Sequence, residues 1–110
     1  MINNNNMILY NITINIDSNV SNLWLDYMKT KHISDVLKTG LFIECKLCRI
    51  HAEEDGGHSY SIQYFLKSLE DYNLYQKNFA EKLQIEHAEK FKGKFAAFRT
   101  LLEVIYEEKA

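Results

Sequence analysis

The chain has 110 residues, of which 46% are hydrophobic and 25% charged, and its formal net charge is -2 at pH 7. This length predicts one domain with its own core, and the nearly balanced charge excludes the strongly basic surface that attracts nucleic acid or anionic lipid. No apolar run approaches the ~20 residues that span a bilayer, and the N-terminus does not resemble a signal peptide. We therefore expect a cytoplasmic protein with no nucleic-acid partner and no membrane partner.

A polar segment precedes the first predicted strand. Residues 1–6, MINNNN, are polar and repetitive, which predicts a disordered segment. Over residues 7–16 apolar and polar side chains alternate, which predicts a strand with one buried face. We expect a single domain over residues 7–106 and a short tail at 107–110.

An apolar stripe predicts the first helix. Its members lie three or four residues apart, as on the face of a helix that covers a sheet: Val20, Leu23, Trp24, Tyr27 and Met28. Asp17 or Ser18 can cap its start. After His32 the pattern restarts at Ile33 and stops at Gly40, which predicts that the helix ends at His32 and that a short apolar turn follows.

A hairpin of two strands is predicted next. The strands are expected at residues 41–53 and 58–66, with the sequence DGG between them. Asp55, Gly56 and Gly57 can supply the positive φ angles of a tight turn, which favours antiparallel pairing.

Two cysteines, Cys45 and Cys48, form a C-x-x-C pattern inside the first strand of this hairpin. Residues three apart in a strand point to opposite faces, whereas redox motifs begin a helix and zinc sites need further ligands. We interpret the two cysteines as small structural thiols.

A second helix and a last strand complete the pattern. Ser68 and Asp71 form a capping box at the start of the helix, and Gly93 ends it. Its apolar stripe is predicted to contain Tyr72, Tyr75, Phe79, Leu83 and Phe91, with His87 on the same side. The last strand is predicted at residues 95–106.

The order β-α-β-β-α-β defines an α+β fold of the ferredoxin-like type, with two helices on one face of a four-stranded antiparallel sheet. The first and third strands are central in this fold, so its open face is predicted to carry a polar centre made of Asn11, Thr13, Asn15, Ser59, Ser61 and Gln63. Four apolar residues are predicted to project from the same face: Leu9, Phe65, Ala97 and Leu101. A face of this mixed character suits a sheet that packs on its twin. We therefore expect a homodimer, with Asn11, Thr13, Gln63 and Arg99 on the dimer face.

Four segments of the chain resemble a small bacterial family known as domain of unknown function 4286: MILYNITINID, DVLKTGLF, DGGHSYSIQYF and GKFAAFRTLLEVI. The resemblance covers Met7 to about Ile105. It implies no activity by itself, but its fold pattern is similar to that of the dimeric α/β barrels, in which two ferredoxin-like subunits set their sheets face to face. That superfamily includes cofactor-independent monooxygenases, small-molecule isomerases, haem proteins and members that only bind or dimerise.

His32 is the candidate catalytic residue. A neutral imidazole at the end of a helix, above a sheet edge, can act as a general acid or base. The alternative, which is the more frequent arrangement, is a half-buried ring whose nitrogens bond the free carbonyls of the helix end. Asp35 is the only acid nearby in sequence, and it does not clearly orient the ring.

Aromatic residues between the sheet and the helices could form the walls of a small-molecule pocket, although such residues more often form a core. The predicted pocket residues are Trp24, Tyr64 and His87. Arg99 is a lone charge in the last strand and needs a carboxylate, a carbonyl or an anionic ligand; an ion pair across the dimer is the commoner solution.

No metal site and no cofactor are predicted. The four histidines are His32, His51, His58 and His87, and none has a partner at the short spacing that metal sites use. A haem would need His32 or His87 as a lone axial ligand, and no C-x-x-C-H is present.

Two hypotheses for function follow from the sequence. The first is a homodimeric small-ligand-binding or interaction module without catalysis. The second is a cofactor-independent enzyme of the monooxygenase or isomerase type, acting on a hydrophobic aromatic or enol-like molecule. In the second, His32 would be the base, and Arg99 or Tyr64 would polarise an oxygen. The absence of an adjacent nucleophile and base favours the first.

Overall fold

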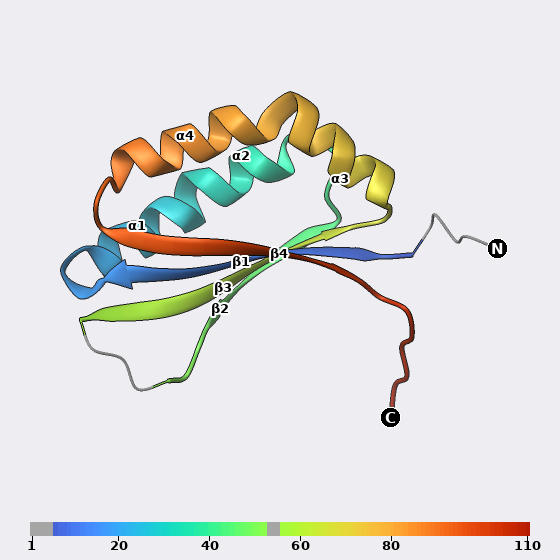
Figure 1. Cartoon of the computed structure of the whole chain (residues 1–110), viewed down its shortest axis with the longest axis horizontal. Helices are drawn as coiled ribbons and strands as arrows, with labels where there is room; N and C mark the ends of the chain where they lie inside the picture. Colours follow the sequence, from blue (N-terminus) through green and yellow to red (C-terminus); the bar gives the residue numbers. More distant parts are fainter. Residues whose placement is uncertain (1–5, 53–55) are drawn as a thin grey trace.

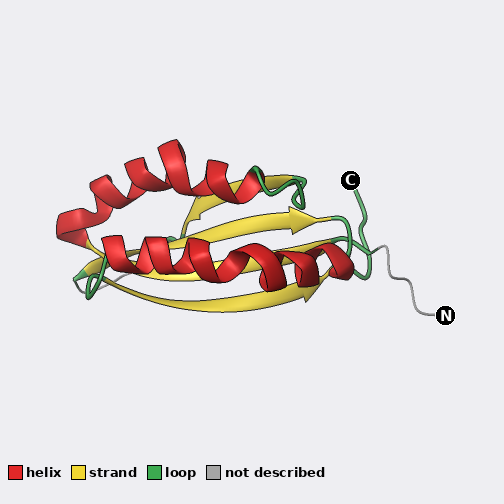
Figure 2. Cartoon of the chain, turned by 90° about the horizontal axis from the view of Figure 1, so that it is seen from above, coloured by secondary structure: helices red, strands yellow, loops and turns green. Residues whose placement is uncertain are grey.

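The computed structural model describes residues 6–52 and 56–110. These residues form one antiparallel sheet of four strands in the order β2-β3-β1-β4, with both helical segments on one of its faces (Figures 1 and 2). The elements are β1 (Ile8–Asp17), α1 (Ser21–Tyr27), α2 (Ile33–Leu37), β2 (Glu44–Arg49), β3 (Gly57–Leu66), α3 (Leu69–Tyr75), α4 (Glu81–Lys90) and β4 (Phe95–Glu103). The predicted ferredoxin-like α+β fold, with β1 and β3 at the centre, is confirmed.

Alternation in β1 and β3 builds the core. β1 pairs with β3 along its whole length, from Ile8 opposite Leu66 to Asp17 opposite Gly57. Facing residues lie on the same side of a sheet, so the two strands bury one continuous apolar surface beneath the helices. It consists of Ile8, Tyr10, Ile14, Ile16, Tyr60, Ile62, Tyr64 and Leu66.

The first helix does not end at His32, and that prediction is wrong. α1 continues through a π-helical turn (Met28–His32) into α2 without a break. In a regular α-helix, Trp24 and Val36 would lie about 120° apart, but a π turn takes up one extra residue and reduces this to about 20°. Both side chains are therefore buried, with 0% and 1% exposure. The apolar pattern restarts at Ile33 because the π turn, which ends at His32, shifts the helix face by one residue.

A second π-helical turn (Gln76–Ala80) joins α3 to α4 in the same way. The predicted stripe of the second helix is wrong at this turn. Ala80 is buried with 3% exposure, whereas Phe79, which was predicted in the stripe, is 38% exposed. Leu23 of the first helix is also outside the buried stripe, with 59% exposure. Regular α-helical spacing had placed Phe79 and Leu23 toward the core.

The predicted helix ends are mostly confirmed. Ser68 accepts a hydrogen bond from the backbone N–H of Asp71 at 3.2 Å, as the capping box requires. Gly93 ends the second helix with a φ of 76°, a left-handed conformation that favours glycine. The cap predicted at Asp17 or Ser18 is not found, because among the described residues neither side chain makes a capping bond.

The outer strands are shorter than predicted. β2 spans only Glu44–Arg49. Just before it, the Phe42 ring packs edge-on against Tyr75, with centroids 4.8 Å apart. β4 ends at Glu103, which lies opposite Ile8 at the start of β1, and one further backbone hydrogen bond joins Val104 N–H to the Met7 carbonyl at 2.9 Å.

Two predictions fall wholly or partly outside the described residues. They concern the disordered segment, apart from Asn6, and the Asp55 position of the hairpin turn. Asn6 donates to the Glu103 carboxylate at 3.2 Å. β2 and β3 pair antiparallel as expected, and Gly56 has a φ of 79°.

The open face of the sheet has the predicted polar centre. Asn11 lies opposite Gln63, and Thr13 lies opposite Ser61. These side chains bond to one another: Ser61 donates to the Asn11 side-chain oxygen, and the Asn11 amide donates to Thr13 Oγ1 at 3.1 Å. Gln63 Nε2 donates to Ser61 Oγ at 3.2 Å, so this polar centre largely satisfies itself.

Arg99, Ala97 and Leu101 were predicted on the open face, and this placement is wrong. Arg99 lies opposite Ile12 and Ala97 opposite Ile14, so both belong to the helix-covered face. The strand FAAFRTLLE has no clean alternation, and its face is set by pairing with β1. The apolar residues on the open face are instead Leu9, Phe65, Phe98 and Leu102.

The two free thiols point to opposite faces of the sheet, as predicted, because Cys45 lies opposite Tyr64 and Cys48 lies opposite Ser61. Over residues 6–52 and 56–110, each helix is too short or too polar to cross a bilayer.

Candidate functional site

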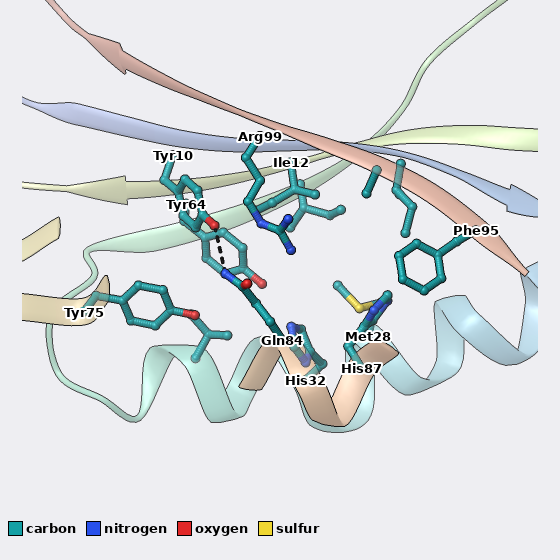
Figure 3. Close-up of a pocket in the computed structure, with 14 residues that line it drawn as sticks. Tyr10, Ile12, Met28, His32, Tyr64, Tyr75, Gln84, His87, Phe95 and Arg99 are labelled. Atoms are coloured by element: carbon teal, nitrogen blue, oxygen red, sulfur yellow. Dashed lines mark hydrogen bonds between the residues drawn. The ribbon is translucent and has the colours of Figure 1, made fainter. Parts of the chain in front are cut away.

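A cavity of about 50 Å³ lies between the sheet and the helices, on the β4 side of the core. Side chains from β1, β3 and β4 reach toward it from the sheet, and those of both helices face them (Figure 3). Its lining includes Tyr10, His32, Tyr64, Gln84, His87 and Arg99, set among apolar neighbours. This volume holds about three water molecules or one small functional group.

The cavity adjoins a larger surface groove. The groove runs between α4 and the edge strand β4, has a volume of about 480 Å³, and includes Gln84, His87 and Arg99 in its walls. The cavity and the groove therefore share part of their walls.

His32 lies at the end of the first π turn and lines the cavity. Burial, opposed by the charges of Glu86 and Asp35, lowers the pKa of His32 below its usual value, so the ring is neutral near pH 7. Among residues 6–52 and 56–110 neither of its nitrogens has a hydrogen-bond partner. The carbonyl-bonded arrangement expected of a helix-end histidine is therefore not the one found.

A bridge between the helices fixes the surroundings of His32. Lys31 contacts the Asp35 carboxylate at 2.7 Å and the Glu86 carboxylate at 2.8 Å. These bonds raise the pKa of Lys31, mainly through Asp35. Through Lys31, the residue that precedes His32, this bridge links the first helical segment to α4.

His87 faces His32 across the cavity, with ring centroids 5.5 Å apart. Its Nε2 accepts a hydrogen bond from the indole N–H of Trp24 at 2.9 Å. Burial first, and then the charges of His32 and Arg99, lower the pKa of His87 to about 4. Trp24 itself is fully buried, stacks on Tyr60, and is not part of the cavity wall. The prediction of Trp24 as a pocket residue is therefore wrong, because its place is behind His87.

Tyr64 contributes a buried hydroxyl without a partner among the described residues. Burial, together with the neighbouring thiol of Cys45, raises its pKa well above the usual value, so it remains a neutral donor. The nearby Tyr10 hydroxyl differs, since it accepts a hydrogen bond from Gln84 at 3.5 Å (Figure 3).

Arg99 reaches from β4 toward the helices (Figure 3). Within the described part of the chain, its guanidinium forms no ion pair and no hydrogen bond. Its positive charge lowers the pKa of His87, after burial and His32 in size. Arg99 thus places an exposed cation at the boundary of cavity and groove.

The sequence identified several residues of this site. The structure brings His32, Tyr64, His87 and Arg99 together, while Asn11, Thr13 and Gln63 lie on the opposite face of the sheet. Gln84 was not anticipated. It lies three residues before His87, and a polar residue at that spacing beside a buried stripe was the available clue.

No group of three or more metal-ligating side chains occurs in residues 6–52 and 56–110. The two cavity histidines have no carboxylate or thiolate in a common cluster.

Comparison with known proteins gives a family and a fold. The model of the family described as Domain of unknown function (DUF4286) matches residues 7–105. No curated protein matches the chain by sequence.

Solved structures match the fold along nearly the whole chain. A dimeric ferredoxin-like protein from an uncultured marine organism superposes with a TM-score of 0.74 and 8% identity, covering 94% of this chain and 99% of that chain. Another from an uncultured marine organism gives a TM-score of 0.70 and 19% identity, covering 94% and 99%. SnoaB, a cofactor-independent oxygenase from Streptomyces nogalater, gives a TM-score of 0.66 and 9% identity, covering 93% and 96%. At these identities the likeness concerns the fold alone.

Proposed function

The chain belongs to the family described as Domain of unknown function (DUF4286), and from this starting point we propose that it forms a homodimer whose subunits each bind a small aromatic or enol-like molecule at the cavity and groove. The family description names no activity, so the proposal rests on the site. Of the two hypotheses from the sequence, the proposal retains the small-ligand-binding module and assigns its binding site to the cavity and the groove.

One observation carries this proposal: three polar groups without protein partners meet at one cavity. They are the buried Tyr64 hydroxyl, the His32 imidazole and the Arg99 guanidinium. Of the three, only the Tyr64 hydroxyl is buried, whereas His32 is half-buried and Arg99 is exposed. Buried polar groups in folded proteins are nearly always paired, so the Tyr64 hydroxyl calls for a water or a ligand. A ligand oxygen in the cavity would satisfy groups that the chain leaves open.

The two volumes indicate how a ligand would fit. Pockets for drug-sized ligands measure ~300–1,000 Å³. The cavity of about 50 Å³ has room only for a head group, whereas the groove of about 480 Å³ has room for a ring system. We therefore place the polar head between His32 and Tyr64 and the apolar part along β4.

The charges indicate which head group is favoured. Arg99 attracts a negative charge, Tyr64 donates a hydrogen bond, and neutral His32 accepts a proton. An acidic hydroxyl, as in a phenol or an enol, matches these three groups.

Binding of 4-nitrophenol, compared with 4-nitroanisole of nearly equal size, tests the proposal by titration calorimetry. We expect the phenol to bind the purified protein and the ether to bind at least fivefold more weakly. Tyr64→Phe and Arg99→Gln should each weaken phenol binding about fivefold to tenfold, the effect of about one hydrogen bond.

Arg49→Gln is the matched control, because Arg49 lies on the other edge strand and bonds to Tyr60 outside the cavity. It should leave binding unchanged. Equal affinity for phenol and ether, or indifference to both site variants, would contradict the proposed site.

The dimer has its own support. The open face carries Phe98 and Leu102, which are 63% and 44% exposed, around a polar centre that is already half-buried. Two of the matching solved structures are described as dimeric ferredoxin-like proteins. We propose that the open faces of two copies pack together.

A second candidate function is proton transfer at carbon. The observation that favours it is His32, a neutral base without a partner, beside Arg99, a cation that can polarise a carbonyl oxygen. In this reaction His32 takes a proton from the carbon next to a carbonyl, an enolate forms, and the proton returns.

Hydrogen–deuterium exchange of 2-tetralone in D₂O tests this candidate by proton NMR. The protein should accelerate loss of the C1 proton signals over buffer, and His32→Ala should remove the acceleration. A rate equal to that in buffer would exclude proton transfer and leave the binding function intact.

A further inference from the structure

The hydrogen bond between Trp24 and His87 fixes where His87 carries its proton. The indole N–H can only donate, so His87 Nε2, 2.9 Å away, must accept and cannot itself be protonated. A neutral imidazole has one proton, which must then be on Nδ1. His87 is thereby assigned the Nδ1–H form.

Packing prevents the alternative orientation of the ring. Trp24 has 0% exposure and stacks on Tyr60 with ring centroids 5.0 Å apart. The His87 ring meets Phe95 edge-on at 4.9 Å. Turning the ring over would place a C–H group against the indole proton and leave a buried donor unpaired.

The protonated nitrogen points away from Trp24, because the two nitrogens of an imidazole face nearly opposite directions. His87 lines both the cavity and the groove, whereas Trp24 lines neither. Among residues 6–52 and 56–110, the Nδ1–H group has no acceptor. The ring thus holds a donor ready for a group that the chain does not supply.

We propose that His87 donates a hydrogen bond to the ligand oxygen, and that Trp24 is a positioning residue that selects the donating tautomer. His32 then accepts the proton of the same oxygen. This inference rests on the proposed binding site and narrows its ligand class to molecules with a hydroxyl group, which both donates and accepts.

The spacing of the two rings permits this arrangement. Their centroids lie 5.5 Å apart with planes inclined by 58°, close enough for one ligand oxygen to contact both. An ether oxygen could accept from His87 but would leave His32 without a donor. Arg99, at the mouth, would retain the ligand if the hydroxyl ionises.

Long-range proton–nitrogen correlation NMR on nitrogen-15-labelled protein at pH 7 tests the tautomer directly. We expect the wild-type His87 signals to show a protonated Nδ1 and an unprotonated Nε2. Trp24→Phe should shift His87 toward the Nε2–H form, which is the favoured tautomer of free imidazole side chains.

Tyr60→Phe is the control, since it changes the ring stacked on Trp24 and leaves the indole N–H in place. It should not change the tautomer. In parallel, Trp24→Phe should weaken binding of 4-nitrophenol about fivefold, the effect of about one hydrogen bond, and Tyr60→Phe should leave it unchanged.

The outcomes separate this inference from the proposed function. Failure of the wild-type protein to bind 4-nitrophenol would contradict the function itself. Binding by a wild-type protein whose His87 carries its proton on Nε2 would overturn the inference alone. The wild-type spectrum decides that point even if Trp24→Phe does not fold, and an unchanged tautomer in a folded Trp24→Phe variant would remove the positioning role.

Discussion

At the scale of single residues, the polar groups of the cavity differ in whether the chain supplies a hydrogen-bond partner. His87 is hydrogen-bonded to Trp24, and the Tyr10 hydroxyl is hydrogen-bonded to Gln84. His32 and Tyr64 have no partner among the described residues. An unpaired buried hydroxyl lowers the stability of the ligand-free protein, and this cost is measurable.

We predict that Tyr64→Phe stabilises the ligand-free protein by about 1 kcal/mol, because it removes a buried hydroxyl that has no partner. The melting temperature should rise by about 4–8 °C for a domain of this size. Tyr10→Phe is the control: its hydroxyl is paired, so the same change should not stabilise. A lower melting temperature for Tyr64→Phe would show that the hydroxyl is satisfied, for instance by bound water.

His87 should make stability depend on pH. Its pKa is lowered to about 4, mainly by burial, so the unfolded chain takes up the proton first as the pH falls. The free energy of unfolding should therefore be unaffected above about pH 6.5, fall by about 2 kcal/mol toward pH 4, and change no further below it through this group.

Urea unfolding at several pH values, for the wild type and for His87→Gln, measures this contribution. The difference between the two proteins should shrink as the pH falls from 6.5 to 4. His32, whose pKa is also lowered by burial, acts in the same direction in both proteins and cancels. Parallel curves would contradict the assignment.

The residue types of the site could be predicted from the sequence, but not all of their roles. His32 was identified as an imidazole at the predicted end of a helix, and Tyr64 as an aromatic residue that could form a pocket wall. The role of Trp24 could not be predicted, because its partner His87 lies 63 positions away and depends on how two helices dock. Arg99 was assigned to the wrong face because an almost uniformly apolar strand does not reveal its phase.

At the scale of elements, the two π turns decide which side chains reach the core. Each inserts one residue into an otherwise continuous helix, one directly before α2 and one directly before α4. Without the first, Trp24 and Val36 could not face the same sheet. Such turns occur often at functional sites, and here one ends at His32.

A single-residue deletion tests this account of the second π turn. Removing the exposed Asn78 should convert the turn to regular α-helix while Tyr75 and Leu83 keep their faces, so the melting temperature should change little. Removing the exposed Ala88 should rotate either Phe91 or the Leu83–His87 stretch by about 100° and destabilise strongly. Equal losses would refute the role assigned to the π turn.

The sequence predicted the elements better than their interior geometry. Strand alternation, the Ser68 cap and the glycine ends follow from local chemistry, and they are found. A π turn has no residue signature of its own, so the sequence indicates a break at the first turn and a regular α-helix at the second. Because of the second π turn, Phe79 is exposed instead of buried.

At the scale of the whole molecule, one face of the sheet is bare (Figure 1). Its centre is a bonded polar network, and its surroundings include Phe98 and Leu102. The arrangement resembles a protein interface more than a plain solvated surface, in that apolar and paired polar groups alternate.

We predict that Phe98→Glu separates the proposed dimer, because it places a charge within the apolar part of the open face. Sedimentation velocity at micromolar concentration should show a dimer for the wild type and a monomer for the variant. Leu23→Glu is the matched control, with similar exposure of 59% against 63% but on the outer side of α1. A monomeric wild type would overturn the dimer and leave the subunit fold unchanged.

The central place of β1 also has a consequence for how the chain is made. β1 is synthesised before β4, but one of its edges pairs with β4, the last of the four strands. Until β4 emerges, that edge presents unpaired backbone beside isoleucine side chains, which is the kind of surface that joins strands of neighbouring chains. Contacts this distant in sequence also slow folding. We therefore expect a chain truncated before Phe95 to aggregate.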